Sequence, residues 1–342
     1  AIFTPAAVPS GVVSRVRTLN PDIVHLHWVG ASFVRPEDVA QFGVPIVWTL
    51  RDLWPFTGGC HYSNGCRRYT ESCGSCPALG STRERDLSRW VWSRKSRAWK
   101  DTGITPVGIG QWIADRARES SLFGGRDIRV IENGIDTEFW QRVPEAEARD
   151  LFSIPADNFV VLFTALNLAD ERKGFRYFVD VCRQLAESAE QPWHALVLGL
   201  TDSGPDLGIP ATYAGLLSDD AAIRSAYSAA TVAVLPSTED AFGKTAAESL
   251  ACGTPCVVFS DTGMADVVDD SESGFVASIG DVDSLVHGVK WLHAEPGRWR
   301  SVSEAGIASA RRRFSVTRQA ALYAQLYAEL ESEADRDNQN RT

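Results

Sequence analysis

The sequence predicts an α/β protein with two domains, each built on a parallel sheet. Its 342 residues exceed the size of a typical single domain. Short apolar runs alternate with helical patterns in both halves of the chain, which is the order expected of parallel α/β sheets. The clearest unit is 231–259, where a strand, a polar loop, a helix and a second strand follow one another.

The composition is typical of a globular chain with an ample core, with 44% hydrophobic and 23% charged residues. A formal net charge of −10 argues against a general nucleic-acid partner. No run of about 18 apolar residues is present, so no transmembrane span is predicted. No signal peptide is visible, and the expected location is the cytoplasm.

In the first half, strands are expected at 22–27, 45–50, 104–109 and 127–131, with helices at 86–100 and 111–120. His27 ends the first strand and Arg51 follows the second. Because the carboxyl ends of parallel strands share one edge, both are candidates for a ligand site. Ordinary packing within the sheet is the alternative interpretation of His27.

The expected helix at 86–100 is basic and rich in tryptophan, with Trp90, Trp92 and Trp99. Basic and aromatic residues together can indicate contact with a membrane surface or an acceptor. Half-buried side chains with exposed polar ends give the same pattern, and we favour that interpretation.

A cysteine-rich loop at 58–77 follows the second strand, with the spacing Cys60-x5-Cys66-x6-Cys73-x2-Cys76. Four thiolates at this spacing suit a tetrahedral structural zinc, which would supply folding energy to a loop with few apolar residues. His61 could replace one ligand. Two disulfides and an iron–sulfur cluster are the alternatives.

The second half repeats the alternation of strands and helices. Strands are expected at 158–166, 194–199, 213–217, 231–235, 256–259 and 274–277, and helices at 175–186, 219–229, 244–251, 284–293, 296–311 and 316–333. The composition changes near 138–148. We therefore predict domains at 1–140 and 141–333, followed by a disordered tail at 334–342.

The loop and helix after strand 231–235 carry two acids, Asp240 and Glu248, which are expected to face one ligand. The amides of Gly243 and Thr245 at the helix start are expected to attract phosphate. An ordinary βαβ unit with solvated acids is the alternative interpretation.

Several motifs agree with one family. The Asp240…Glu248 segment, Asn133-Gly134-Ile135-Asp136 and Arg172-Lys173-Gly174 resemble motifs of retaining GT-B glycosyltransferases of family 4. The run PIVWTLRDLWPFTGGCHY, with the cysteines after it, resembles a bacterial polysaccharide-biosynthesis subgroup. The resemblance covers residues 20–330. It implies two Rossmann-like domains facing across a cleft, with the acceptor on the first and the nucleotide sugar on the second.

The resemblance also implies residue roles. Lys173 would neutralise the diphosphate as the glycosidic bond breaks, Glu248 would accept hydrogen bonds from the ribose, and Asp240 would hold sugar hydroxyls. No catalytic metal is expected. The other expected donor-binding residues are Arg172, Asn167, Gly215, Leu216, Phe242, Gly243, Lys244 and Thr245, with Gly215 and Leu216 bracketing the base.

The chain departs from the family pattern in several places. Arg51 stands where the family commonly has histidine near the donor sugar. Arginine cannot act as a base at neutral pH, but it could bind phosphate or an acidic acceptor. The first acid is usually glutamate rather than Asp240. Asn167 lies nearest the place of an arginine in the family, and Arg172 could compensate. The family's first strand and glycine-rich loop are not found, so the N-terminal domain is expected to be incomplete.

The leading hypothesis is a retaining glycosyltransferase of surface polysaccharide biosynthesis. It would move a sugar from a UDP- or GDP-sugar to a glycan or lipid-linked acceptor. A lipid-linked acceptor would bring peripheral contact with the inner face of a membrane. One alternative is a GT-B epimerase or phosphorylase. The other is a degenerate or truncated GT-B module that binds nucleotide or a partner without catalysis.

Overall fold

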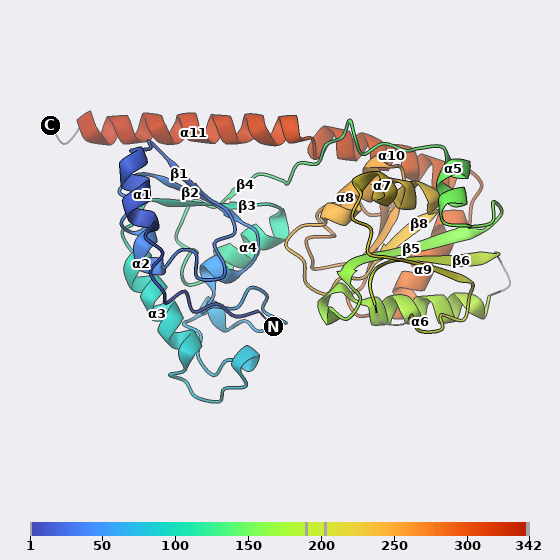
Figure 1. Ribbon diagram of the computed structural model, residues 1–342, viewed down its shortest axis with the longest axis horizontal. Helices are drawn as coiled ribbons and strands as arrows, with labels where there is room; N and C mark the ends of the chain where they lie inside the picture. Colours follow the sequence, from blue (N-terminus) through green and yellow to red (C-terminus); the bar gives the residue numbers. More distant parts are fainter. Residues whose placement is uncertain (1, 189–190, 202–203, 340–342) are drawn as a thin grey trace. The chain divides into compact units, whose positions relative to one another are not determined.

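The computed structural model describes residues 2–188, 191–201 and 204–339, and it confirms two α/β units, each with its own parallel sheet (Figure 1). Unit 1 comprises residues 1–132 and 320–342, and unit 2 comprises residues 133–319.

The sheet of unit 1 has four parallel strands in sequential order: β1 (Val24–Leu26), β2 (Ile46–Leu50), β3 (Ile104–Gly108) and β4 (Arg129–Val130). Every residue of β2 is buried, which explains why the strand is apolar except for Thr49, since both faces of a parallel sheet are covered. The helices of this unit before residue 133 are α1 (Val12–Leu19), α2 (Pro36–Val39), α3 (Leu87–Trp99) and α4 (Gln111–Glu119).

Adjacent residues of β2 point to opposite faces and contact different helices. On one face, the Trp48 ring lies 5.2 Å from the ring of Trp99 in α3. On the other face, Val47 shares a buried cluster with Tyr323 and Leu326 of α11 (Val316–Gln339). The C-terminal helix is therefore part of the core of unit 1.

This packing corrects two predictions about the C-terminus. The chain from Ala320 onward belongs to unit 1, whereas the sequence placed residues up to 333 in the second domain. The predicted disordered tail begins at 334, but α11 continues to Gln339. Residues 340–342 lie outside the described residues.

The sheet of unit 2 has six parallel strands in the order β10-β9-β8-β5-β6-β7. Their bounds are β5 (Phe159–Asn167), β6 (Trp193–Leu200), β7 (Ala211–Gly215), β8 (Val232–Leu235), β9 (Cys256–Phe259) and β10 (Gly274–Ala277). The chain builds outward from β5 to β7, then returns to β8 and builds the other way. The reversal between β5 and β8 is a topological switch point, the place where open α/β sheets bind ligands.

The helices of unit 2 are α5 (Glu145–Leu151), η4 (Glu171–Lys173, a 3-10 turn), α6 (Phe175–Ala186), α7 (Asp220–Ala229), α8 (Lys244–Ala251), α9 (Val282–His293) and α10 (Arg298–Arg313). The segment after β4 packs onto this unit: the Ile135 amide donates to the Phe314 carbonyl at 2.6 Å, and Arg142 donates to Ser303 at 3.0 Å. These contacts place the boundary at 132/133 rather than the predicted 140/141.

The tryptophan-rich helix α3 presents a mixed face. Trp99 is buried, Trp92 donates its indole N–H to Ser121, and Trp90 is 47% exposed beneath the Arg94 guanidinium. Among the described residues, no helix combines the length and the hydropathy needed to cross a bilayer.

Candidate functional site

An ion pair joins the two loops that flank the switch point of unit 2. Lys173 follows β5 and Asp240 follows β8, and Lys173 Nζ lies 2.6 Å from Asp240 Oδ2. Both side chains are largely shielded, with exposed fractions of 24% and 10%. The structure thus brings together two residues that the sequence selected from different motifs.

A glycine allows this approach. Gly174 has a φ of 76°, and a Cβ atom at that position would lie 2.0 Å from the Pro236 carbonyl oxygen. The backbone of η4 can therefore run against the end of β8 only without a side chain at residue 174. The Thr238 amide donates to the Arg172 carbonyl at 2.9 Å, which fixes the two loops together.

Arg172 connects the same two loops. Its guanidinium donates to the Glu239 carbonyl at 2.8 Å and to Asp170 at 2.9 Å, and it lies 3.9 Å from Asp240 Oδ2. Asp240 therefore has two cations beside it. Arg172 is half-buried in the loops and is not a solvated surface charge.

Glu248 lies on α8 and is only 5% exposed. The Tyr227 hydroxyl donates to its Oε2 at 3.2 Å, and Lys244 Nζ lies 2.9 Å from Oε1. Burial raises the pKa of Glu248, and Lys244 offsets part of that rise. Burial, together with the Glu248 charge, holds the pKa of Tyr227 well above its usual value. Tyr227 carries no signal in the sequence, because a tyrosine on a helix of this kind looks like a core residue.

Asp240 and Glu248 were expected to face one ligand, but the structure gives them separate partners. Asp240 contacts Lys173 and Arg172, whereas Glu248 contacts Lys244 and Tyr227. Asp240 lies in the loop between β8 and α8, and Glu248 lies within α8, so a ligand that contacts both would have to reach from the loop to the helix.

The start of α8 leaves its first amides without a side-chain cap, since its N-cap residue is Gly243. Such amides are suited to binding an anion. Phe242 differs from expectation: its side chain is 6% exposed and packs edge-on against Phe314, with ring centroids 5.6 Å apart. Phe242 is therefore a core residue, which corrects its predicted role in binding the donor.

The remaining expected donor residues lie at the same edge of the sheet but apart from the ion pair. Asn167 ends β5, is exposed, and accepts a hydrogen bond from the Ala169 amide at 2.8 Å. Gly215 ends the edge strand β7 with a φ of 69°, and Leu216 is 47% exposed. Strand β6 separates β7 from β5, so these two residues lie away from the switch point.

In unit 1, His27 and Arg51 lie beyond the ends of adjacent strands, as the sequence predicts. Arg51 Nη2 lies 3.4 Å from His27 Nδ1. Burial and the Arg51 charge lower the pKa of His27, so its imidazole is neutral at physiological pH. A guanidinium beside a neutral imidazole can bind an anionic group.

His61 is committed to a buried polar network. Its Nδ1 lies 2.6 Å from Asp52 Oδ2, and its Nε2 lies 2.9 Å from Thr4 Oγ1. Both imidazole nitrogens are therefore occupied, which removes His61 as a substitute metal ligand. The four loop cysteines, Cys60, Cys66, Cys73 and Cys76, are free thiols that line one small cavity of about 20 Å³. Burial raises the pKa of Cys60 to about 12 and that of Cys73 to about 11.

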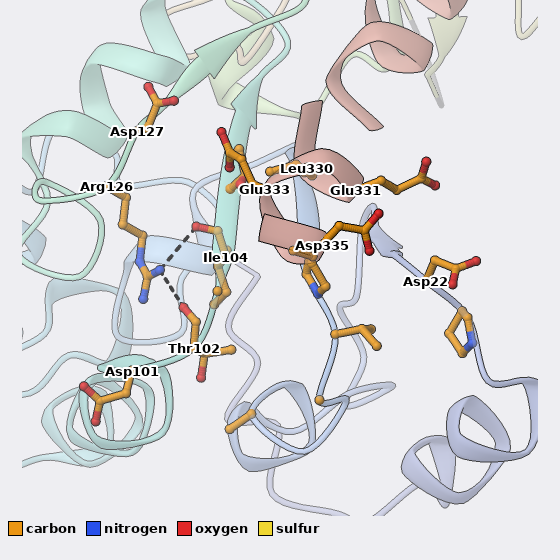
Figure 2. A pocket seen from close by; sticks show the side chains of 18 of the residues that line it. Asp22, Asp101, Thr102, Ile104, Arg126, Asp127, Leu330, Glu331, Glu333 and Asp335 are labelled. Atoms are coloured by element: carbon orange, nitrogen blue, oxygen red, sulfur yellow. Dashed lines mark hydrogen bonds between the residues drawn. The ribbon is translucent and has the colours of Figure 1, made fainter. Parts of the chain in front are cut away.

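A larger cavity of unit 1, of about 1190 Å³, opens at the amino ends of its strands (Figure 2). Its Arg126 is engaged with the carbonyl oxygens of Thr102 and Ile104, at 2.9 and 3.2 Å. Its lining includes the acids Asp22, Asp101, Asp127, Glu331, Glu333 and Asp335. This lining would repel a diphosphate, and the cavity lies at the edge opposite to that used for ligands in parallel sheets.

Residues 158–295, which form most of unit 2, match the family described as Glycosyl transferases group 1. Unit 2 is therefore similar to the group 1 glycosyltransferases over most of its length. WcaC of Escherichia coli K12, provisionally named a colanic acid biosynthesis glycosyl transferase, is 28% identical over 134 residues, which are 35% of this chain and 33% of that protein.

A second relative is the GDP-mannose-dependent alpha-(1-6)-phosphatidylinositol dimannoside mannosyltransferase of Mycobacterium tuberculosis (strain ATCC 25177 / H37Ra). It is 33% identical over 93 residues, which are 27% of this chain and 24% of that protein. The chain therefore spans a third or less of the length of these two curated relatives.

Two solved structures show that the chain has the GT-B fold. Sucrose-phosphate synthase (tll1590) from Thermosynechococcus elongatus has a TM-score of 0.69 at 21% identity, over 94% of this chain and 78% of that one. Anabaena Alr3699/HepE in complex with UDP-glucose has a TM-score of 0.66 at 18% identity, over 96% of this chain and 85% of that one. At these identities the likeness concerns the fold.

Proposed function

We propose that this protein is a retaining glycosyltransferase of family 4 that moves a sugar from a nucleotide-sugar donor to a glycan or lipid-linked acceptor in surface polysaccharide biosynthesis. The observation that carries the proposal is the Lys173–Asp240 pair at the switch point of a unit that is similar to the group 1 glycosyltransferases. The provisional name of WcaC, which refers to colanic acid biosynthesis, supports the polysaccharide assignment.

The electrostatics of the pair suit a diphosphate leaving group. When a glycosidic bond to a nucleoside diphosphate breaks, negative charge develops on the leaving phosphate. Lys173, Arg172 and the uncapped amides of α8 are positive groups in the same loops. In the absence of donor, Asp240 neutralises Lys173. A bound diphosphate would replace Asp240 as the ion-pair partner of Lys173. Asp240 would then accept hydrogen bonds from sugar hydroxyls.

Glu248 is suited to hold the ribose. It is a buried carboxylate with one oxygen braced by the Tyr227 hydroxyl. A carboxylate fixed in this way accepts hydrogen bonds from vicinal hydroxyls without much loss of side-chain freedom. UDP- and GDP-sugars are the two donor classes we propose, because one GT-B neighbour was solved with UDP-glucose and one relative is named GDP-mannose-dependent.

The nucleotide class can be tested by thermal shift of the full chain with UDP, GDP, ADP and dTDP. A ligand at about 100 times its Kd should stabilise the fold by about 2.7 kcal/mol. We expect a shift with UDP or GDP that is lost in Glu248→Ala. The matched control is Glu187→Ala, which removes an exposed glutamate of the same unit.

Transfer is then measured with the sugar nucleotides of the preferred base and an acceptor mixture of glycans and lipid-linked saccharides. The anomeric configuration of the product, read by NMR, tests retention. A nucleotide-induced shift without transfer would favour a module that only binds nucleotide. No shift with any nucleotide, from a folded sample, would overturn the proposed donor site. Conversion of the donor without acceptor would indicate an epimerase.

A further inference from the structure

The segment 57–86 of unit 1 has little regular structure. It contains the short 3-10 helices η2 (Arg68–Thr70) and η3 (Pro77–Leu79), and Cys60 forms one isolated bridge with Phe3. A stretch of this length without strands or longer helices needs another source of order. The four cysteine side chains of the segment, in contrast, lie together around one point.

The four sulfur-bearing side chains line a single cavity together with Gly58 and Tyr69. The cavity volume of about 20 Å³ is enough for one water molecule or one ion. The cavity joins residues from both ends of the loop. A bond formed there would therefore close the whole segment.

The backbone around Cys73 is held in an unusual conformation. Three successive residues, Cys73, Gly74 and Ser75, have φ values of 52°, 101° and 43°. Non-glycine residues adopt this region only when their surroundings require it. The Gly58 amide donates to Cys73 Sγ at 3.1 Å, and a Cβ atom at Gly58 would lie 2.8 Å from Cys73 Cβ. The Cys73-x2-Cys76 turn is thus pressed against the opposite end of the loop.

A buried cation lies beside the same loop. The side chain of Lys95 is fully buried, and its ammonium donates to the carbonyl oxygens of Trp54 and Thr57. The Thr57 hydroxyl in turn donates to the Cys60 carbonyl at 2.7 Å. In the part of the chain that the structure describes, Lys95 has no carboxylate within ion-pair distance. Burial lowers the pKa of Lys95 to about 7, so negative charge nearby would favour the charged form of this side chain.

We propose that Cys60, Cys66, Cys73 and Cys76 bind one structural Zn²⁺ ion as four thiolates. Each thiol releases its proton to solvent when the ion binds, and no electron is transferred. A zinc ion with four thiolates has a net negative charge, which provides the partner that Lys95 lacks. Four protein ligands leave no open position, so the ion stabilises the loop and takes no part in transfer.

Among the described residues, no group of three or more His, Cys, Asp or Glu side chains is arranged to hold a metal ion as it stands. Binding therefore requires the four cysteine side chains to rotate toward the centre of their shared cavity. Two disulfides would also close the loop, but they are neutral and would leave Lys95 without a counter-charge.

The test uses the full-length protein, purified without chelators and dialysed. Elemental analysis should give one zinc per chain, and modification of the thiols should release it to a colorimetric zinc indicator. Replacement by Co²⁺ should give the visible spectrum of tetrahedral cobalt thiolate. Cys66→Ser and Cys73→Ser should lose most of the bound zinc, whereas Cys182→Ser, a buried cysteine of α6 in unit 2, should keep it.

The measurements on the unsubstituted protein do not depend on whether the cysteine variants fold. Four titratable thiols without bound metal, or two disulfides found by counting thiols after denaturation, would overturn the proposal. Detection of iron with an equimolar amount of sulfide would show that the loop holds an iron–sulfur cluster, which would also overturn the proposal. None of these outcomes depends on sugar transfer, so the proposed function stands or falls separately.

Discussion

Gly174 lies so close to Pro236 that the position tolerates no side chain: a Cβ atom would be 2.0 Å from the Pro236 carbonyl oxygen. Gly174→Ala should therefore push η4 away from the end of β8 and separate Lys173 from Asp240. We expect a loss of about 1–3 kcal/mol in unfolding free energy and a large loss of nucleotide affinity. Urea denaturation and calorimetric titration with UDP and GDP measure the two effects.

Gly297→Ala is the matched control. Gly297 also has a positive φ, of 83°, but a Cβ atom added there would meet no atom within 4 Å. Gly297→Ala should therefore lower the unfolding free energy, because alanine is unfavourable at a positive φ. It should leave the affinity for nucleotide unchanged. Equal loss of affinity in both variants would contradict the role of the Gly174–Pro236 approach.

Lys173→Ala should lower kcat by about 10²- to 10³-fold, since one charge that stabilises the leaving diphosphate is removed. KM for the donor should change less than kcat if Lys173 acts mainly in the transition state. Lys100→Ala, which removes an exposed lysine of unit 1, is the control. Steady-state kinetics with the preferred sugar nucleotide measure both constants. An unchanged kcat in Lys173→Ala would show that Lys173 takes no part in the transfer step.

Glu248→Gln should weaken nucleoside diphosphate binding by about 10- to 100-fold, the cost of losing charge-assisted hydrogen bonds to the ribose. The same change should raise Tm at neutral pH. Burial raises the pKa of Glu248, so its contribution to stability is full below the usual value of 4.5 and is lost as pH rises through the raised value.

The gain in Tm should consequently disappear in acid, where the carboxyl group is protonated in both folded and unfolded chains. Scanning Tm against pH for wild type and Glu248→Gln gives the comparison. A variant that is less stable than wild type at neutral pH, with unchanged affinity for nucleotide, would show that Glu248 is a structural residue.

Arg51→Ala should impair transfer while leaving nucleotide affinity unchanged, because Arg51 lies in unit 1 and the proposed nucleotide contacts lie in unit 2. We expect KM for an anionic acceptor to rise about 10-fold or more, in line with loss of a charged hydrogen bond. Titration with UDP or GDP provides the control measurement. A change in nucleotide affinity equal to the change in transfer would contradict this division of roles.

Folding of unit 1 should weaken as pH falls below the usual histidine pKa. His25 lies between the hydroxyls of Tyr327 at 2.5 Å and Thr49 at 2.7 Å. Burial, with smaller effects of His27 and Arg51, lowers the pKa of His25 to about 4. The stability that comes from keeping His25 neutral is complete above 6.5 and is lost as pH falls toward 4.

Urea denaturation at a series of pH values tests this dependence. His25→Phe should be less stable at neutral pH by about 1–3 kcal/mol, because the Tyr327 hydroxyl loses its hydrogen bond to His25 and the Thr49 hydroxyl keeps only its bond to Tyr323. Its stability should then change less than that of wild type across the acidic range. Parallel pH profiles for the two proteins would show that another group controls the acid response.

Local patterns in the sequence determined the fold class, nearly all strands and helices, and the residues of the candidate donor site. Helices α6 and α8 begin and end where their apolar spacing and flanking glycines predict. Motif spacing selected Lys173, Asp240 and Glu248, and cysteine spacing selected the loop for which we propose a metal. These features depend on residues close together in the chain, which one sequence displays directly.

Only the tertiary structure decided which residues meet. Strand order cannot be read from strand patterns, so the switch point between β5 and β8 emerged from the sheet topology. The return of α11 to unit 1, the burial of Phe242 against Phe314, and the contact of Tyr227 with Glu248 all join segments far apart in sequence. Such contacts are set by how whole elements pack, and a helix that looks amphipathic gives no indication of which sheet it will cover.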